Sequence, residues 1–152
     1  MSLTKKNNRI AFFNGPNLNL LGARNVEIYG KETLTAIETR LAAHAVKAGY
    51  TLRALQSNSE GGLIDAVHEA RQDCVAVIIN PGAYSHSSIA LRDALECFAG
   101  PIIEVHLSNI FQREEFRRHS YISEVASGVI CGLGPSGYDL ALQAVVQLLS
   151  RF

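Results

Sequence analysis

The chain has 152 residues, of which 47% are hydrophobic, and this is about one domain's worth of sequence with enough apolar side chains for one core. Lysine plus arginine and aspartate plus glutamate number 14 each, so the basic surplus that binding to a phosphate backbone requires is absent. We therefore expect a single domain, spanning residues 1–152, that binds no nucleic acid.

The cysteines and the N-terminal residues indicate the compartment. Cys74, Cys97 and Cys131 stand singly, and an odd number without Cys-x-x-Cys spacing favours a reducing compartment over a disulfide framework. Residues 1–8 read as a polar N-terminal extension with no apolar segment after it, and no stretch is long enough to span a bilayer. We expect a cytoplasmic protein that does not associate with membranes.

Apolar runs alternate with amphipathic stretches from the beginning of the chain. Residues 10–13 are a short apolar run that stops at an Asn-Gly-Pro-Asn sequence, which predicts a strand followed by a loop. Apolar residues then recur at helical spacing over 34–48. Gly49 is positioned to end this helix, and Thr33 or Thr35 can cap its first turn. Together these segments predict one βα unit.

The rest of the chain continues this alternation. Residues 75–79 are uniformly apolar, which is typical of a strand covered on both faces in a parallel sheet. The other predicted elements are strands at 51–55, 102–106 and near Val129, and helices at 60–71, about 87–98, near Arg113 and at 138–149. We interpret the pattern as an α/β fold, a doubly wound five-stranded parallel sheet in the flavodoxin-like order.

Three polar clusters follow predicted strands, at residues 14–19, 80–86 and 104–109. In open α/β sheets, ligands bind outside the carboxyl ends of the strands, so the three clusters are expected to open onto one crevice. Asparagine, glycine and proline are also ordinary turn residues, and each cluster alone fits a simple turn. The coincidence of all three favours a functional site.

A glycine motif at residues 132–137, Gly-Leu-Gly-Pro-Ser-Gly, matches the dinucleotide-binding fingerprint and lies between a predicted strand and a predicted helix. That fingerprint also needs a further strand and an acidic residue about 20 positions on, whereas the sequence ends at Phe152. We interpret the motif as a structural turn into the last helix.

The ordered motifs carry a specific resemblance. They are Asn14-Gly-Pro-Asn-Leu-Asn-Leu-Leu-Gly22 with Arg24 and Tyr29, the segments 80–86 and 104–109, and Arg113-Glu-Glu-Phe-Arg-Arg-His-Ser-Tyr121. In this order and at these separations the chain resembles type II 3-dehydroquinate dehydratase from about Arg9 to Leu149. The resemblance implies dehydration of 3-dehydroquinate to 3-dehydroshikimate in the shikimate pathway of aromatic amino acid biosynthesis. It also implies a homo-oligomer, a dodecamer built from trimers.

Removal of a proton next to a ketone forms an enolate, which requires a base, stabilisation of the enolate and an acid for the leaving hydroxyl. By the resemblance Tyr29 is the base, Arg24 is the cation that favours its phenolate, and Asn17 orients a water or donor toward the enolate oxygen. Without the other motifs, Tyr29 and Arg24 would read as ordinary loop residues. Glycines in the segment 18–30 favour a mobile active-site loop that closes over the substrate.

Glu104 and His106 lie two residues apart on a predicted strand, so their side chains point to the same face. A carboxylate there can orient the imidazole and favour its protonated form, which makes His106 the candidate acid. The alternative is a hydrogen-bonded histidine and glutamate of the core with no catalytic role. Their place at the carboxyl end of the strand favours the acid.

The remaining site residues bind substrate by the resemblance. Asn80 and the amides of Leu107 and Ser108 hold the substrate carboxylate, while His86 and Arg117 bind ring hydroxyls. Arg113 and Arg117 are four apart on the predicted short helix and share a face, and Glu114 can pair with Arg117 or Arg118. The set is completed by Asp93, which reaches a neighbouring subunit's site in the family but could equally be a helix-surface charge here.

Some residue types point away from other chemistries. The lysines needed for a Schiff base are absent from the strand-end motifs after the third and fourth strands, because the chain's lysines are Lys5, Lys6, Lys31 and Lys47. Metal-ligand spacing is also missing, so we expect no metal and no cofactor. An FMN-binding electron carrier and a non-catalytic assembly protein remain as alternatives. Ser59, where the family often has histidine, and His119 are left without a role.

Overall fold

The computed structural model describes residues 8–151, so the predicted N-terminal extension lies, apart from Asn8, outside the described residues. The strands are β1 (Arg9–Asn14), β2 (Thr51–Gln56), β3 (Ala76–Asn80), β4 (Ile102–His106) and β5 (Gly128–Cys131). They pair in parallel in the order β2-β1-β3-β4-β5. This order is the flavodoxin-like one, and the predicted single-domain α/β sheet is confirmed.

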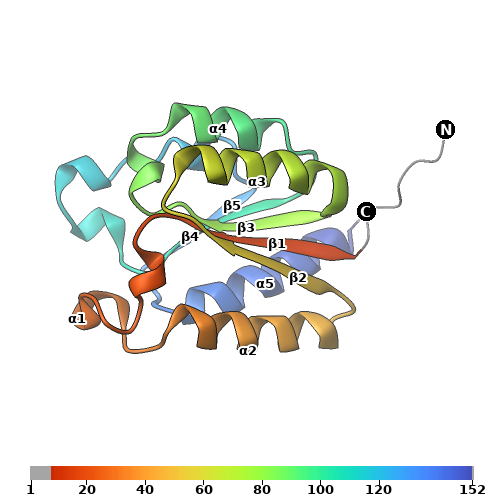
Figure 1. The fold of residues 1–152 in the computed structure, drawn as a ribbon, viewed down its shortest axis with the longest axis horizontal. Helices are drawn as coiled ribbons and strands as arrows, with labels where there is room; N and C mark the ends of the chain where they lie inside the picture. The colour runs from red at the N-terminus through yellow and green to blue at the C-terminus, as the bar shows by residue number, and fades with distance from the viewer. Residues whose placement is uncertain (1–7, 152) are drawn as a thin grey trace.

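Helices cover both faces of the sheet (Figure 1). They are α1 (Val26–Tyr29), α2 (Leu34–Lys47), α3 (Glu60–Asp73), α4 (Ile89–Glu96) and α5 (Ser136–Leu149). Figure 1 shows α2 and α5 on one face of the sheet and α3 and α4 on the other, while α1 lies beyond the carboxyl ends of the strands. Within residues 8–151, no helix is both long and apolar enough to cross a membrane.

The strand residues alternate between two cores because successive side chains of a strand point to opposite faces. Ile10 and Phe12 belong to the core beneath α2 and α5, whereas Ala11 and Phe13 belong to the core beneath α3 and α4. Every residue of β3 is buried, as the uniformly apolar sequence predicts for a strand covered on both faces.

Helix boundaries differ slightly from the predictions, for reasons of capping. Thr33, one of the two candidate caps, accepts a hydrogen bond from the Ala36 amide and begins α2. The predicted helix at about 87–98 begins only at Ile89, because the buried Ser88 hydroxyl accepts from the Leu91 amide. Ser59 plays the same part for α3 by accepting from the Gly62 amide, which assigns this serine a structural role.

The predicted short helix near Arg113 is not one continuous helix, because Arg113 lies between two short 3-10 helices. The segment after β4 instead forms three 3-10 turns, η3 (Ile110–Gln112), η4 (Glu115–Arg117) and η5 (Ile122–Glu124). Arg113 itself is extended, with φ −96° and ψ −168°, so η3 ends before it. Arg113 and Arg117 therefore do not share a helix face.

The loops after β1 and β3 touch at the carboxyl end of the sheet. The Gly15 amide donates to the Asn80 carbonyl at 2.8 Å. A Cβ at position 15 would lie 2.2 Å from the Pro81 carbonyl oxygen, so a side chain there would push the two loops apart. The glycine therefore brings the first two polar clusters together.

Candidate active site

One cavity of about 190 Å³ lies at the carboxyl end of the sheet. Ten of the twelve predicted site residues line it: Asn17, Arg24, Tyr29, Asn80, His86, His106, Leu107, Ser108, Arg113 and Arg117. Apolar side chains complete its wall: Leu18, Leu20, Leu21 and Ile110. A small cavity with apolar walls and convergent polar groups is the form expected of a small-molecule site.

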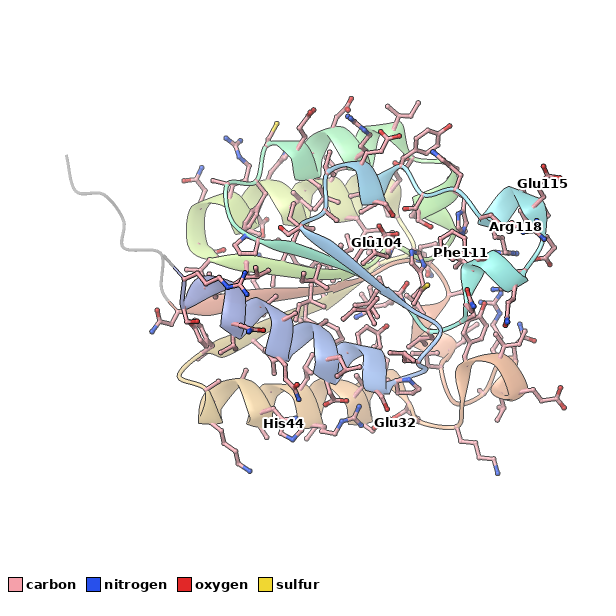
Figure 2. The ribbon with its side chains drawn as sticks, turned by 180° about the vertical axis from the view of Figure 1, so that it is seen from behind. Glu32, His44, Glu104, Phe111, Glu115 and Arg118 are labelled. Atoms are coloured by element: carbon pink, nitrogen blue, oxygen red, sulfur yellow. The ribbon has the colours of Figure 1, made fainter. Side chains whose placement is uncertain are left out.

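Glu104 does not line the cavity and is wholly buried in the sheet, where Figure 2 labels it. Its carboxylate accepts a hydrogen bond from His106 Nε2 and further bonds from the hydroxyls of Ser120, at 2.7 Å, and Ser123, at 2.6 Å. Burial acts to raise the pKa of the Glu104 carboxyl, but the bonds and charge of His106 and the two hydroxyls outweigh it and lower the pKa below 4.5. Glu104 is therefore a buried carboxylate at neutral pH.

Tyr29 ends α1 and turns its ring toward two guanidinium groups. Arg113 Nη1 donates to the Tyr29 hydroxyl oxygen at 2.7 Å, and the Arg113 Cζ lies 5.7 Å from the centre of the ring. The Cζ of Arg24 lies 5.9 Å from the same ring centre. The resemblance implies that Arg24 is the cation beside Tyr29, whereas the hydrogen bond to the hydroxyl comes from Arg113.

Asn80 is oriented by hydrogen bonds on both ends of its carboxamide. Its Nδ2 donates to the Tyr138 hydroxyl at 2.9 Å, and its Oδ1 accepts from the Gly82 amide at 3.1 Å. The Tyr138 hydroxyl in turn donates to Asn14 Oδ1 at 2.6 Å, and burial raises the pKa of Tyr138 far above its ordinary value, so it stays neutral. One N–H of Asn80 is thus left for a ligand, and this N–H is a donor.

His86 has a defined tautomer because of His119. The Nδ1 of His86 lies 2.8 Å from the His119 carbonyl oxygen, which can only accept, so Nδ1 carries the proton. Burial lowers the pKa of His86 below its ordinary value of 6.5, and the ring is neutral at pH 7. Its Nε2 is then an acceptor. The role of His119, which the sequence left open, is to supply this carbonyl.

Of the remaining charged residues that the sequence singled out, Glu114 and Arg118 lie in the segment after β4, and Asp93 lies on α4. Glu114 accepts from Arg117 Nε at 2.9 Å, so of the two partners considered it pairs with Arg117. Arg118 instead donates to the Arg113 carbonyl at 3.2 Å. Asp93 is exposed on α4, where it pairs with Arg92 at 3.1 Å, and it does not line the cavity of its own subunit.

Asn17 adopts a left-handed backbone conformation, φ 68°, which is uncommon for a residue other than glycine. Its amide donates to the Asn58 side chain at 3.0 Å, and this contact holds the loop between β1 and the 3-10 helix η1 (Leu18–Leu20) against the loop after β2. Conformations of this kind cluster at functional sites.

The glycine motif at 132–137 forms the turn into α5, with φ 88° at Gly132 and 62° at Gly134. A Cβ at position 132 would lie 3.0 Å from the Asn109 side chain, so the glycine permits close packing of β5 against the segment after β4. Among residues 8–151, no three histidine, cysteine, aspartate or glutamate side chains gather as metal ligands would.

Several partners of the site residues were not identified from the sequence. Four hydrogen bonds of the site connect residues that are 16 to 84 positions apart in the chain. They are the bonds of Ser120 and Ser123 to Glu104, of Asn80 to Tyr138 and of Arg113 to Tyr29. The serines stand in the motif at 113–121 or just after it, but a serine hydroxyl in a polar segment carries no signal of its buried partner.

The chain matches a known protein family and known proteins over most of its length. The family described as Dehydroquinase class II matches residues 8–146. A 3-dehydroquinate dehydratase of Methylococcus capsulatus is 58% identical over 143 residues, which cover 93% of this chain and 97% of that protein. The enzyme of the same name from Cereibacter sphaeroides is 52% identical and covers 91% of this chain and 95% of its own.

Solved structures show the same relationship. The crystal structure of the type II dehydroquinase from Propionibacterium acnes superposes with a TM-score of 0.89 at 43% identity, over 92% of this chain and 97% of that one. These matches give no support to a flavin-binding electron carrier or to a non-catalytic assembly protein. With the match over residues 8–146, they show that this chain belongs to the class II dehydroquinase family.

Proposed function

We propose that this chain catalyses the dehydration of 3-dehydroquinate to 3-dehydroshikimate, the hydro-lyase step of the shikimate pathway, through an enolate. Membership of the family and the name 3-dehydroquinate dehydratase carried by relatives 52% and 58% identical support the reaction. The observation that carries the proposal is that Tyr29, bonded to an arginine, and His106, bonded to a buried carboxylate, line one cavity.

In the proposed first step, the phenolate of Tyr29 takes the proton from the carbon next to the ketone. The two electrons of the broken C–H bond form the enolate, whose charge lies on the former ketone oxygen. Arg113 and Arg24 favour the phenolate because a guanidinium keeps its charge and does not compete for the proton. Asn17 lines the cavity and orients a water or donor toward the enolate oxygen.

In the second step, the enolate collapses to the conjugated enone and expels the hydroxyl on the neighbouring carbon as water. His106 supplies the proton. Its Nε2 is bound to Glu104, so Nδ1 is the ring nitrogen that can donate to the leaving oxygen. The buried carboxylate of Glu104 stabilises the positive charge on the ring before the transfer.

The polar groups around the cavity match the substrate's functional groups. The free N–H of Asn80, the amides of Leu107 and Ser108 and the Ser108 hydroxyl are neutral donors suited to the substrate carboxylate. We assign His86, whose Nε2 is an acceptor, to a ring hydroxyl that donates to it, and Arg117 to a second ring oxygen.

The assembly, the location and the mobile loop belong to the same proposal. We infer a cytoplasmic homododecamer built from trimers, in which Asp93 reaches the site of a neighbouring subunit, since it lies outside its own cavity. The segment 18–30 contributes Arg24 and Tyr29, and we infer that it closes over the substrate. Sedimentation equilibrium tests the assembly: twelve chains of 16.5 kDa are expected, and a monomer contradicts it.

The reaction is tested by adding 3-dehydroquinate to the purified protein and following the ultraviolet absorbance of the conjugated enone. We expect enone to form with no added metal or cofactor and at a rate proportional to protein concentration. His106→Asn, which cannot act as the acid, is expected to lower kcat by about 10²-fold or more. Absence of enone from correctly folded protein would reject the proposed reaction.

A further inference from the structure

Two serine hydroxyls that do not line the substrate cavity donate to the carboxylate of Glu104. Ser120 Oγ lies 2.7 Å from Oε2, and Ser123 Oγ lies 2.6 Å from Oε1. Oε2 also accepts from His106 Nε2. Both oxygens of a wholly buried carboxylate are therefore engaged, and two of the three bonds come from the segment around η5.

The direction of the Ser120 bond follows from counting donors and acceptors. Ser120 Oγ accepts from the amides of Ile122, at 3.2 Å, and Ser123, at 3.4 Å. A hydroxyl has two lone pairs and one proton, so with both lone pairs engaged its proton points to Glu104 Oε2. Oε2 also faces His106 Nε2, and the lowered pKa of the Glu104 carboxyl leaves it ionised at neutral pH. The proton in the bond between Glu104 and His106 consequently belongs to the histidine.

We propose that Ser120 and Ser123 are positioning residues of the active site, whose hydroxyls keep Glu104 ionised and thereby hold the His106 ring with Nε2 protonated and Nδ1 free for the cavity. The proposal rests on the proposed function, in which His106 protonates the leaving hydroxyl. Neither serine lines the cavity, so each acts through Glu104.

The surroundings of Glu104 leave this task to the serines and to His106. The residues in register with Glu104 on the two neighbouring strands are Ile79 and Val129, which carry no charge and no donor on their side chains. His86, at the end of the 3-10 helix η2 (Gly82–His86), is a second titratable group near enough for the Glu104 charge to act on it. The serine hydroxyls do not titrate, so they are donors to the carboxylate at every pH.

The two serines are expected to contribute unequally. Ser120 is buried, with 7% of its surface exposed, whereas Ser123 is an exposed residue whose hydroxyl reaches inward. Water can take the place of the Ser123 hydroxyl more readily than that of Ser120. Loss of the Ser120 hydroxyl should therefore affect Glu104 more, because a buried acceptor then loses a donor without replacement.

The test compares Ser120→Ala, Ser123→Ala and Ser123→Thr with the wild type in two measurements. The first is kcat against pH with 3-dehydroquinate. We expect the acidic limb to move up by about one pH unit in Ser120→Ala, a loss of about tenfold in kcat on that side, because a bond to a charged group is worth about one pKa unit or more. Ser123→Ala should move it less, and Ser123→Thr, which keeps the hydroxyl, should match the wild type.

The second measurement is the titration of the Glu104 side-chain carboxyl carbon by ¹³C NMR, which needs no turnover. We expect Glu104 to take up its proton at a higher pH in Ser120→Ala than in the wild type. The control is Ser127→Ala, since the Ser127 hydroxyl binds the Ile102 amide at the other end of β4. Neither measurement should change in this control.

The outcomes separate the inference from the proposed function. An unchanged Glu104 titration in the serine variants overturns the inference, whether or not the wild type forms enone. A shifted titration in a protein that forms no enone supports the positioning role and rejects the reaction. Should Ser120→Ala not fold, the exposed Ser123 pair decides: equal titrations in Ser123→Ala and Ser123→Thr overturn the inference.

Discussion

At the scale of single residues, Tyr29 depends on an arginine that is remote in sequence. The bond from Arg113 to the Tyr29 hydroxyl, 2.7 Å long, spans 84 residues and joins the loop after β1 to the segment after β4. An oxygen that accepts a hydrogen bond from a permanent cation is stabilised as an anion. In our account, Arg113 thus supports the base as well as bordering the substrate.

Arg113→Met removes this donor and its charge. We expect kcat for 3-dehydroquinate to fall by about 10-fold to 100-fold, the value of one hydrogen bond to a charged group. The control is Arg71→Met, because Arg71 binds the Cys97 carbonyl away from the cavity. Equal kcat in Arg113→Met and the wild type would show that Arg113 does not support the base.

His86 gives a second test at this scale. Since its Nδ1 donates to the His119 carbonyl and burial lowers its pKa, we expect a neutral ring at pH 7 with the proton on Nδ1. Nitrogen-15 NMR distinguishes the two tautomers directly, and the second proton should be taken up only below pH 6.5. A proton on Nε2 at neutral pH would contradict the assigned acceptor role.

At the scale of elements, a chain of three buried side chains links β1, α5 and β3 beneath the cavity. Asn80 donates to Tyr138, and Tyr138 donates to Asn14. Asn14 Nδ2 is a buried donor that finds no acceptor among the described residues. The network therefore has no free acceptor with which its side chains could form a different set of hydrogen bonds. Asn80 consequently presents its N–H groups in one orientation.

Tyr138→Phe keeps the ring, which packs edge-on against Phe12 at 5.0 Å, but removes the hydroxyl. We expect KM for 3-dehydroquinate to rise by several-fold with a smaller change in kcat, because Asn80 loses its orientation. The free energy of unfolding should fall by about 1 to 3 kcal/mol, since buried polar atoms lose a partner. Tyr50→Phe serves as the control, because Tyr50 packs against the same core but does not line the cavity. An unchanged KM in Tyr138→Phe would contradict the positioning of Asn80.

The elements also show what the sequence can and cannot predict. A strand such as β3 was predicted because its buried residues 76–79 form an uninterrupted apolar run. The segment after β4 was not, because its turns depend on contacts such as that of Ser120 with Glu104 rather than on a periodic pattern. Likewise, the motifs predicted most cavity-lining residues, whereas the partners that orient them came only with the tertiary structure.

At the scale of the whole molecule, the buried carboxylate couples the site to stability. The pKa of Glu104 lies below 4.5 in the folded protein, so the unfolded chain binds the proton more readily. Glu104 ionisation therefore contributes stability that is complete above the unfolded pKa of about 4.5 and is lost as the pH falls through the lower folded pKa.

Glu104→Gln has no carboxylate at this position, so it lacks the stability that ionisation of Glu104 contributes. We expect the variant to be less stable than the wild type at pH 7, because a buried amide cannot accept all the bonds that the carboxylate accepts. The difference should shrink as the pH falls below 4.5, and urea unfolding at a fixed protein concentration measures it. A difference that grows toward acid pH would contradict the ionised state of Glu104.

The fold brings Tyr29 from the first loop and His106 from the fourth strand to one cavity. Our central proposal is that Tyr29 removes the proton. The most direct measurement is kcat of Tyr29→Phe for 3-dehydroquinate, with substrate binding followed by calorimetry to show that the site is intact. We predict a fall in kcat of about 10²-fold to 10⁴-fold with binding retained. Turnover equal to that of the wild type would contradict the account.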